Sequence, residues 1–203
     1  MTPSEPSAEP GAHAAPEELH PLLDPFSPAD SLFPVDGTAV LDLPRVTDRA
    51  TLLSFLEDYR RQLLGAVELP AIERACRHGQ RNEWRELLAL DAALSAHVPG
   101  PALAAASRRA GQGHLRRLRP LRDQRVVQRY LTAVEAGEAH GWHTLVFGIT
   151  LAVYSLPVRQ GLMTYARQAL RGFIQAAAGP LRLDEDECLE CVLDPVVALE
   201  VPR

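Results

Sequence analysis

The stretch Gly141–Phe173, with the sequence GWHTLVFGITLAVYSLPVRQGLMTYARQALRGF, decides the fold of this chain. Its first part, Thr144–Val153, is almost uninterruptedly apolar. Because this run is much shorter than the ~20 apolar residues that cross a bilayer, it predicts a helix buried on all sides of a protein core. Pro157 then separates this helix from the next, since proline is tolerated in the first turn of a helix and not in its interior.

The residues after Pro157 predict a second, amphipathic helix. Its apolar side chains recur at helical spacing, at Leu162, Ala166, Ala169 and Phe173. Three polar residues are expected to lie away from this stripe: Arg159, Gln168 and Arg171. The sequence of these two helices contains no nucleophile motif, cofactor-binding loop or complete set of metal ligands, so we expect them to form the centre of a helical core.

The composition fits one domain of ordinary size, since 203 residues are enough to bury a real core. The apolar fraction of 46% with only 5% aromatic residues favours helices over a β-sandwich. The net charge of −5 argues against a dedicated nucleic-acid-binding protein. Three cysteines do not make a disulfide framework. No basic segment followed by an apolar run marks a secretory signal, so we expect a cytoplasmic protein. We also expect it to bind neither nucleic acid nor a membrane.

The N-terminal residues fall into two segments. Residues 1–20 are rich in Pro, Ala, Ser and Glu and are expected to form a disordered tail. Residues 21–46 keep the prolines but add large apolar side chains, among them Leu32 and Phe33. We interpret them as an extended arm that either covers the chain's own helices or docks on a partner. Residues 47–200 are then expected to form the helical domain.

The first helices of this domain are predicted from capping residues and glycines. Thr47 is expected to be the N-cap of the first helix, with Asp48 favourably placed near the positive end of the helix dipole. Gly65 weakens the continuation of this helix. A second helix is expected from about residue 69 to 77, and Gly79 is suited to the left-handed cap that ends it.

The later helices follow the same signals. Asn82 is expected to cap the third helix and Asp123 the fifth. Gly111 and Gly113 each lower the stability of a helix by roughly 1 kcal/mol relative to alanine, and therefore predict a kink or an early end in the fourth helix. Asp184 is expected to cap a last, acidic helix. No alternating run is long enough for a sheet. The sequence therefore predicts an all-α fold, a single-domain bundle of about seven to eight helices with a disordered N-terminal tail.

Two segments carry opposite charge. Eight arginines lie between Arg108 and Arg129, with Asp123 the only acid among them. These arginines could form a patch that binds phosphate or the acidic surface of a partner protein. Alternatively, they are an ordinary solvent-exposed face of two helices. Seven acids and no base lie between Asp184 and Glu200. The two segments could pair with each other, within one chain or between subunits.

The candidate metal and redox residues are incomplete. Cys188 and Cys191 form a C-x-x-C, but zinc would need two further ligands and a redox motif would need a thioredoxin-like strand before it. Neighbouring acids also disfavour the thiolate, which leaves two packed thiols as the main interpretation. His140 and His143 could face one metal, although a capping or interface role is favoured. No hydrolase, zinc-protease or phosphate-loop motif is present, so we expect no enzyme, no catalytic residues, no cofactor and no metal site.

The central stretch resembles the urease accessory protein UreF family. The resemblance rests on His143-x-x-Val146-Phe147-Gly148, on Leu156-Pro157 and on Tyr165 in the following helix. It extends outward through Ser31–Val35, Glu68–Ala71, Leu90-Asp91 and the Ser107-to-Gly111 helix. Roughly residues 24–195 are covered, in the family's order and spacing.

This resemblance implies an all-α, usually dimeric protein without enzymatic activity. UreF bridges the UreD (UreH) scaffold and the GTPase UreG, so that nickel is delivered to apo-urease during GTP hydrolysis. The implied role is therefore a nickel-insertion chaperone subunit, with a scaffold, a GTPase, apo-urease and a second copy of the chain as its partners.

The resemblance also suggests roles for particular residues. Tyr165 and Arg171, expected on the exposed side of the helix after Pro157, are candidates for the GTPase contact. The apolar arm with Leu32 and Phe33, and the acidic segment that begins at Asp184 and Glu185, are candidates for the scaffold contact. The remaining motif residues are expected to hold the fold: His143, Phe147, Gly148, Pro157, Ser107 and Gly111.

The sequence departs from the family pattern in two segments. After Val35 the family's Gly-Gly-Phe-Ser segment is replaced by Asp36–Val40, and near the end its Arg-Leu-x-Pro-Leu-Gly-Gln is replaced by Gly179–Glu185. These departures leave two alternatives open. The chain could be a helical adaptor of UreF ancestry that works outside urease maturation, or a metal or redox protein that uses Cys188 and Cys191.

Overall fold

The computed structural model describes residues 46–97 and 100–182. The predicted tail at 1–20, nearly all of the arm at 21–46 and the last predicted helix lie outside these residues. The candidate contacts Leu32, Phe33, Asp184 and Glu185 therefore lie outside them as well, and so do Cys188 and Cys191.

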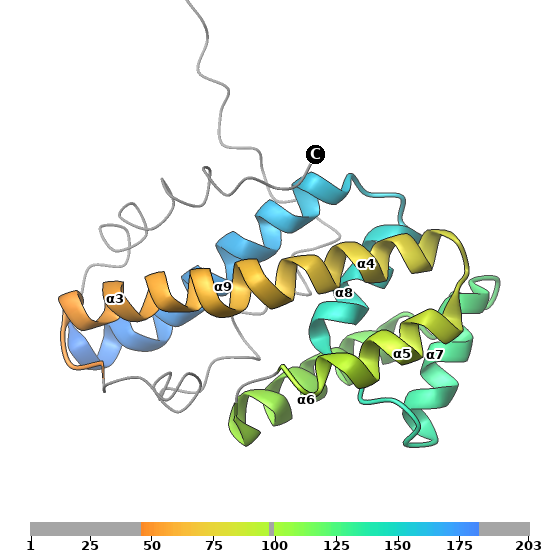
Figure 1. The fold of residues 1–203 in the computed structure, drawn as a ribbon, viewed down its shortest axis with the longest axis horizontal. Coiled ribbons are helices and arrows are strands. Elements are labelled where there is room, and N and C mark those ends of the chain that lie inside the picture. The colour runs from red at the N-terminus through yellow and green to blue at the C-terminus, as the bar shows by residue number, and fades with distance from the viewer. Residues whose placement is uncertain (1–45, 98–99, 183–203) are drawn as a thin grey trace, which may run out of the picture.

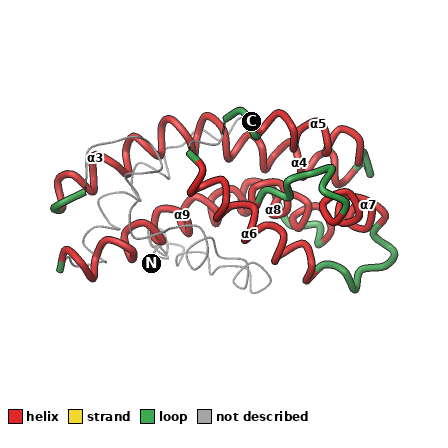
Figure 2. The backbone as a smooth tube through the Cα atoms, turned by 90° about the horizontal axis from the view of Figure 1, so that it is seen from below, coloured by secondary structure: helices red, strands yellow, loops and turns green. Residues whose placement is uncertain are grey.

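The described residues are all-α, as the sequence predicts, and contain no strand (Figures 1 and 2). They form six continuous helical segments: a rod made of α3 (Arg49–Tyr59), the π-helix η2 (Arg60–Glu68) and α4 (Leu69–Gln80), followed by α5 (Trp84–Leu94), α6 (Pro101–Arg117), α7 (Arg125–Glu135), α8 (His143–Val153) and α9 (Val158–Leu181). The expected number was about seven to eight. The described residues contain fewer because the first two expected helices are one rod and because the last expected helix lies outside these residues. None of these helices is both long and apolar enough to cross a membrane.

The rod begins one residue later than the sequence suggests. Asp48, not Thr47, is the N-cap, because its carboxylate accepts a hydrogen bond from the Thr51 N–H at 2.9 Å. The Asp48 N–H donates in return to the Thr51 hydroxyl at 3.0 Å, which completes a capping box. Gly65 does not end this helix but lies inside the π-helix, through which the chain continues into α4.

α8 is the buried centre of the fold, as its apolar sequence predicts. Every side chain from His143 to Leu151 is buried. Phe147 and Leu151 face a cluster formed with the rod and α9, whereas Val146 and Ile149 face a second cluster formed with α5, α6 and α7. In Figure 1 the rod and α9 form a long layer, and the shorter helices α5, α6 and α7 gather around one end of it.

Glycines let other helices approach α8. A Cβ at Gly148 would overlap the Ile72 carbonyl oxygen and lie 2.8 Å from the Ala75 Cβ. Gly79 packs on Ala152 in the same way. The prediction that Gly79 is a left-handed cap is therefore wrong, since it lies inside α4 and the left-handed residue is Asn82, with φ of 56°.

The predictions for α6 and α7 were also partly wrong. Gly111 does not end α6, which runs on to Arg117, because that glycine lets the helix pack directly on the backbone of Trp142 and His143. The N-cap of α7 is Gln124, one residue after the predicted Asp123. Gly137, with φ of 76°, follows the last turn of α7 in the left-handed conformation expected there.

α9 begins directly after Pro157, as predicted, and the Pro157 carbonyl accepts the Gly161 N–H at 3.0 Å. Its predicted apolar stripe of Leu162, Ala166, Ala169 and Phe173 is buried. Arg159 and Arg171 are exposed as expected. Gln168, however, is only 5% exposed, because α9 is covered on more than one side.

Candidate functional site

Tyr165 is the motif residue whose position differs most from the prediction. Its side chain is 1% exposed, so the expectation that it lies on the outer face of α9 was wrong. Position 165 follows Leu162 by three residues and precedes Ala169 by four, which places it on the buried stripe. There it lies against the ring of His143, with 5.8 Å between ring centroids, and against Phe147 at 5.2 Å.

The hydroxyl group of Tyr165 belongs to a buried polar cluster around Glu68, the last residue of the π-helix. The Tyr59 hydroxyl donates to the Glu68 carboxylate at 2.6 Å, and the Tyr165 hydroxyl donates to the same group. Burial raises the pKa of Glu68 to about 7, although both tyrosine hydrogen bonds act in the opposite direction. Burial also raises the pKa of both tyrosines, which remain neutral. The cluster ties both ends of the π-helix to α9.

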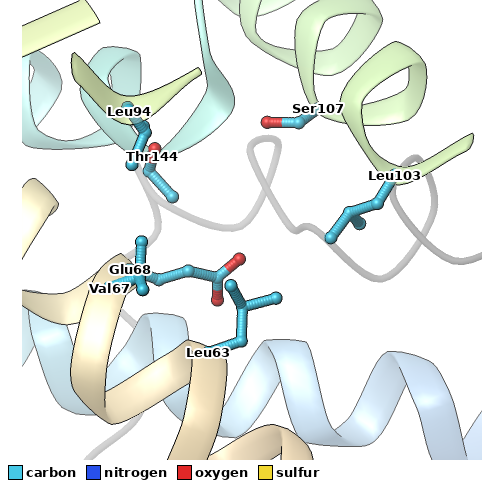
Figure 3. Close-up of a pocket in the computed structure, with 7 residues that line it drawn as sticks. All are labelled: Leu63, Val67, Glu68, Leu94, Leu103, Ser107 and Thr144. Atoms are coloured by element: carbon cyan, nitrogen blue, oxygen red, sulfur yellow. The ribbon is translucent and has the colours of Figure 1, made fainter. Parts of the chain in front are cut away.

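The Glu68 carboxylate points into a small cavity between the rod, α5, α6 and α8 (Figure 3). Its lining residues are Leu63, Val67, Glu68, Leu94, Leu103, Ser107 and Thr144. Its volume of about 20 Å³ is enough for one water molecule and too small for an organic substrate. Within the described residues, the buried Thr144 hydroxyl has no hydrogen-bond partner, so a water molecule there would satisfy it.

The other motif residues meet at the start of α8. His143 is 2% exposed, and its backbone N–H donates to the Ser107 hydroxyl at 3.2 Å. Gly111, one turn further along α6, lies under the same backbone, where a Cβ would be 2.6 Å from the His143 nitrogen. These contacts, with the crossing at Gly148, agree with a structural role for the motif.

His143 and His140 do not share a site. The His140 ring stacks on Trp142 and its Nδ1 is 2.8 Å from an Asp91 oxygen, whereas the His143 ring packs on Tyr165. Among the described residues, no group of three or more His, Cys, Asp or Glu side chains could hold a metal ion. Cys76 is buried and its pKa is raised to about 11 by that burial, so it is not a reactive thiol.

The sequence analysis included Asp91 in the family pattern but missed its role, which is to hold the loop before α8. Its side chain is 1% exposed, and the carboxylate accepts hydrogen bonds from the Tyr130 hydroxyl at 2.6 Å and from the N–H groups of His140 at 2.8 Å and Gly141 at 3.0 Å. Its carbonyl accepts the Trp142 indole N–H at 2.9 Å. The signal was present, because Asp91 follows Leu87 by four residues on the apolar face of α5.

His114 was also missed. Its ring is 4% exposed and lies 6.2 Å from that of His143, between centroids, and its Nε2 is hydrogen-bonded to the Thr150 hydroxyl at 2.9 Å. Burial lowers the pKa of His114 well below its ordinary value, with the His143 ring adding to this effect. His114 is therefore neutral at physiological pH.

Comparison with protein families agrees with the resemblance seen in the motif. The model of the UreF family matches residues 46–192, well over half of the chain and all of the helices described above. The chain belongs to the UreF family of urease accessory proteins. Comparison with curated proteins found no match.

UreF is an accessory family, not a family of enzymes, and this directs attention to the surfaces of the chain. One basic described surface is the arginine end, which we define as the seven exposed arginines of the second half of α6, the α6–α7 loop and α7: Arg109, Arg116, Arg117, Arg119, Arg122, Arg125 and Arg129. Arg119 pairs with Glu135, and Arg129 lies over the Trp84 ring, 5.4 Å from its centroid. In both Figures 1 and 2 the α6–α7 loop is at one end of the long axis.

Proposed function

We propose that this UreF family member is a nickel-insertion chaperone subunit in the cytoplasm. As a homodimer, it would bridge a UreD/UreH-type scaffold and a UreG-type GTPase, so that nickel reaches apo-urease during urease maturation. The observation that carries this proposal is the family match over residues 46–192, which includes the whole described helical domain. Nickel is cargo in this role, and the chain needs no catalytic group of its own.

The arrangement of the helices supports a protein that works by presenting surfaces. The motif residues close the crossing of α4, α6 and α8, and the cavity beside them holds no more than about one water molecule. Arg171 is exposed on α9 and remains our candidate for the GTPase contact. Tyr165 is buried, so we assign it to positioning α9 through Glu68 and His143. Leu32, Phe33, Asp184 and Glu185 remain proposed scaffold contacts.

The test is size-exclusion chromatography with light scattering of the chain mixed with UreD-type and UreG-type proteins of the same organism. We expect a complex with the scaffold that then admits the GTPase. Failure of a well-folded chain to bind either protein would overturn the proposal.

Arg171→Glu tests the GTPase contact, with Arg159→Glu as the matched control on the same helix. We expect the Arg171 variant to bind the scaffold normally and to retain the GTPase at least about tenfold more weakly, because a reversed charge in an interface typically costs more than 1.4 kcal/mol. Equal GTPase binding by both variants would remove this assignment.

The second candidate is a helical adaptor of UreF ancestry that acts outside urease maturation. The sequence departures at Asp36–Val40 and Gly179–Glu185 favour it. A genome without urease structural and accessory genes near this gene, together with failed scaffold binding, would support the adaptor.

A further inference from the structure

The arginine end carries more positive charge than its own acids balance. Arg119 pairs with Glu135. Arg122 and Arg125 form no ion pair with any residue that the structure describes, although Asp123 lies between them in the chain. Because the whole chain carries −5, this surface is a local exception on an acidic protein. Its positive charge is therefore available to a partner of opposite charge.

Two arginines are held in place by Trp84, the first residue of α5. The guanidinium of Arg129 lies over the indole ring at 5.4 Å from its centroid, and that of Arg85 lies over the same ring at 5.6 Å. Both arginines are exposed, and the exposed acid beside them in the chain is Glu86. A guanidinium held over an aromatic ring has lost side-chain freedom, yet its N–H groups can still bind a carboxylate with two hydrogen bonds. Trp84 therefore presents two arginines that are ordered before a partner binds.

Helical spacing extends this surface along α7. Arg125 precedes Arg129 by four residues, so the two side chains are neighbours on one face of the helix. Arg122 comes three residues before Arg125, at the end of the α6–α7 loop, and is also exposed. The exposed charges therefore run as a stripe from Trp84 to the α6–α7 loop.

The tryptophans of this region favour a protein over a single-stranded nucleic acid as the partner. The Trp84 ring packs against the second core cluster and is covered by the two guanidinium groups. Trp142, which lies under Arg108 at 5.7 Å, is only 2% exposed. Little of either ring is left for a base to stack on, although such stacking is typical of proteins that bind single strands. Tryptophan and arginine are instead enriched where proteins bind one another most strongly.

The arginine end lies far from the other proposed contacts. Rings of Phe173 and Phe55 pack edge to face at 4.9 Å, so the part of α9 that carries Arg171 lies beside α3. Asp184, a proposed scaffold contact, follows the end of α9 by three residues. Trp84 comes just after the other end of the rod, and roughly 35 Å of helix separates Phe55 from that end. Figure 1 shows the same arrangement, with the end of α9 on the left and α7 on the right.

We propose that the arginine end docks onto an acidic surface of a partner protein, and that in the urease assembly this partner is apo-urease. The inference rests on the proposed function, which assigns the GTPase to Arg171 and leaves the arginine end accessible while the GTPase is bound. Carboxylates of apo-urease pair with the two arginines over Trp84 and with the stripe on α7. The contact is electrostatic, so it weakens as the salt concentration rises.

The experiment measures the binding of apo-urease to the preformed complex of this chain with the UreD-type and UreG-type proteins of the same organism. The charge-reversal variant carries Arg122→Glu and Arg125→Glu. The matched control carries Arg74→Glu and Arg159→Glu, at exposed positions of α4 and α9. Binding is measured by surface plasmon resonance at about 0.1 and 0.5 M NaCl, which screen charges to different extents, and circular dichroism checks the folding of each variant.

We expect all of these chains to form the complex with the scaffold and the GTPase. The charge-reversal variant should then bind apo-urease at least about tenfold more weakly than the wild type at low salt, and the difference should shrink at high salt. The control should bind like the wild type.

A second variant, Arg85→Lys with Arg129→Lys, separates the planar guanidinium groups from their charge. Lysine keeps the positive charge but cannot bind a carboxylate through two parallel N–H groups. We expect this variant to bind apo-urease at least about threefold more weakly than the wild type. Equal affinity would overturn the role assigned to the two arginines over Trp84.

The outcomes separate this inference from the proposed function. A wild-type chain that forms no complex with the scaffold or the GTPase would overturn both. A complex that forms normally but binds apo-urease equally with and without the charge reversal would overturn the inference alone. So would a reversal that instead releases the scaffold or the GTPase, or one that only removes co-purifying nucleic acid, since the arginine end would then have a different partner.

Discussion

The replacement Glu68→Gln should make the stability of this protein less dependent on pH. The carboxyl group of Glu68 has an ordinary pKa of 4.5, and burial raises it to about 7 in the folded protein. Folding therefore favours the protonated form. The stabilisation is fully present below pH 4.5 and is lost as the pH rises through 7. A neutral glutamine removes this titration.

The size of the effect follows from the two pKa values. The difference corresponds to about 3 kcal/mol in the free energy of unfolding. Because part of the Glu68 side chain remains exposed to solvent, screening reduces the effect that we expect to ~2 kcal/mol. Between pH 5 and pH 8 the wild-type protein should lose about this much stability relative to the glutamine variant.

Urea unfolding followed by circular dichroism at pH 5, 6, 7 and 8 measures this difference. Glu138→Gln, at an exposed position, is the matched control and should follow the wild type at every pH. A difference between wild type and Glu68→Gln that stays constant from pH 5 to pH 8 would refute the reasoning, because the carboxyl group would then titrate alike in the folded and unfolded chains.

Three further predictions concern the core. Gly148→Ala should destabilise the protein by about 1–3 kcal/mol, because the new methyl group overlaps the backbone of α4. Gly113→Ala, with open space at its Cβ, should be neutral or stabilising by up to ~1 kcal/mol. Thermal melts test this pair, and equal melting temperatures of the two variants would contradict it. Asp91→Ala should lower the free energy of unfolding by about 3–5 kcal/mol and speed hydrogen exchange at the Gly141 amide, since it leaves buried donors unpaired. Unchanged exchange at that amide would show that Asp91 does not hold the loop. His114→Gln should reduce the loss of stability below pH 6.5, because the lowered pKa of His114 contributes stability that is present above pH 6.5 and is lost as the pH falls toward the pKa in the folded protein. Urea unfolding at pH 5 and pH 7 measures this loss, and an equal loss in the wild type and the variant would contradict the prediction.

Much of the fold could be predicted from local signals. The buried helix α8, its break at Pro157 and the stripe of Leu162, Ala166 and Ala169 all follow from the spacing of apolar residues along the chain. Helix boundaries were correct to within one residue where a capping residue stood near the end, as at Asp48 and Gln124. Glycines were interpreted less well, because glycine occurs both in turns and where two helices cross closely, and the sequence does not distinguish the two.

The candidate site was predicted only in part. The motif identified His143, Ser107 and Gly111 as structural residues, and the structure brings them together. It did not identify the buried position of Tyr165 or the roles of Asp91. Helical spacing alone indicated that both side chains are buried, whereas the partners that give them their roles lie far away in the sequence.

The sequence by itself determined the all-α class, the apolar face of each helix and the family, because each depends on residue type and spacing along one segment. Only the tertiary structure decided which polar groups are buried and which glycines are required. Glu68, Asp91 and His114 acquire their environments from other helices that cross over them, and no local pattern carries the position of a crossing helix. The physical reason is that burial and hydrogen bonding depend on everything packed around a group, whereas helix formation depends mainly on its neighbours in the chain.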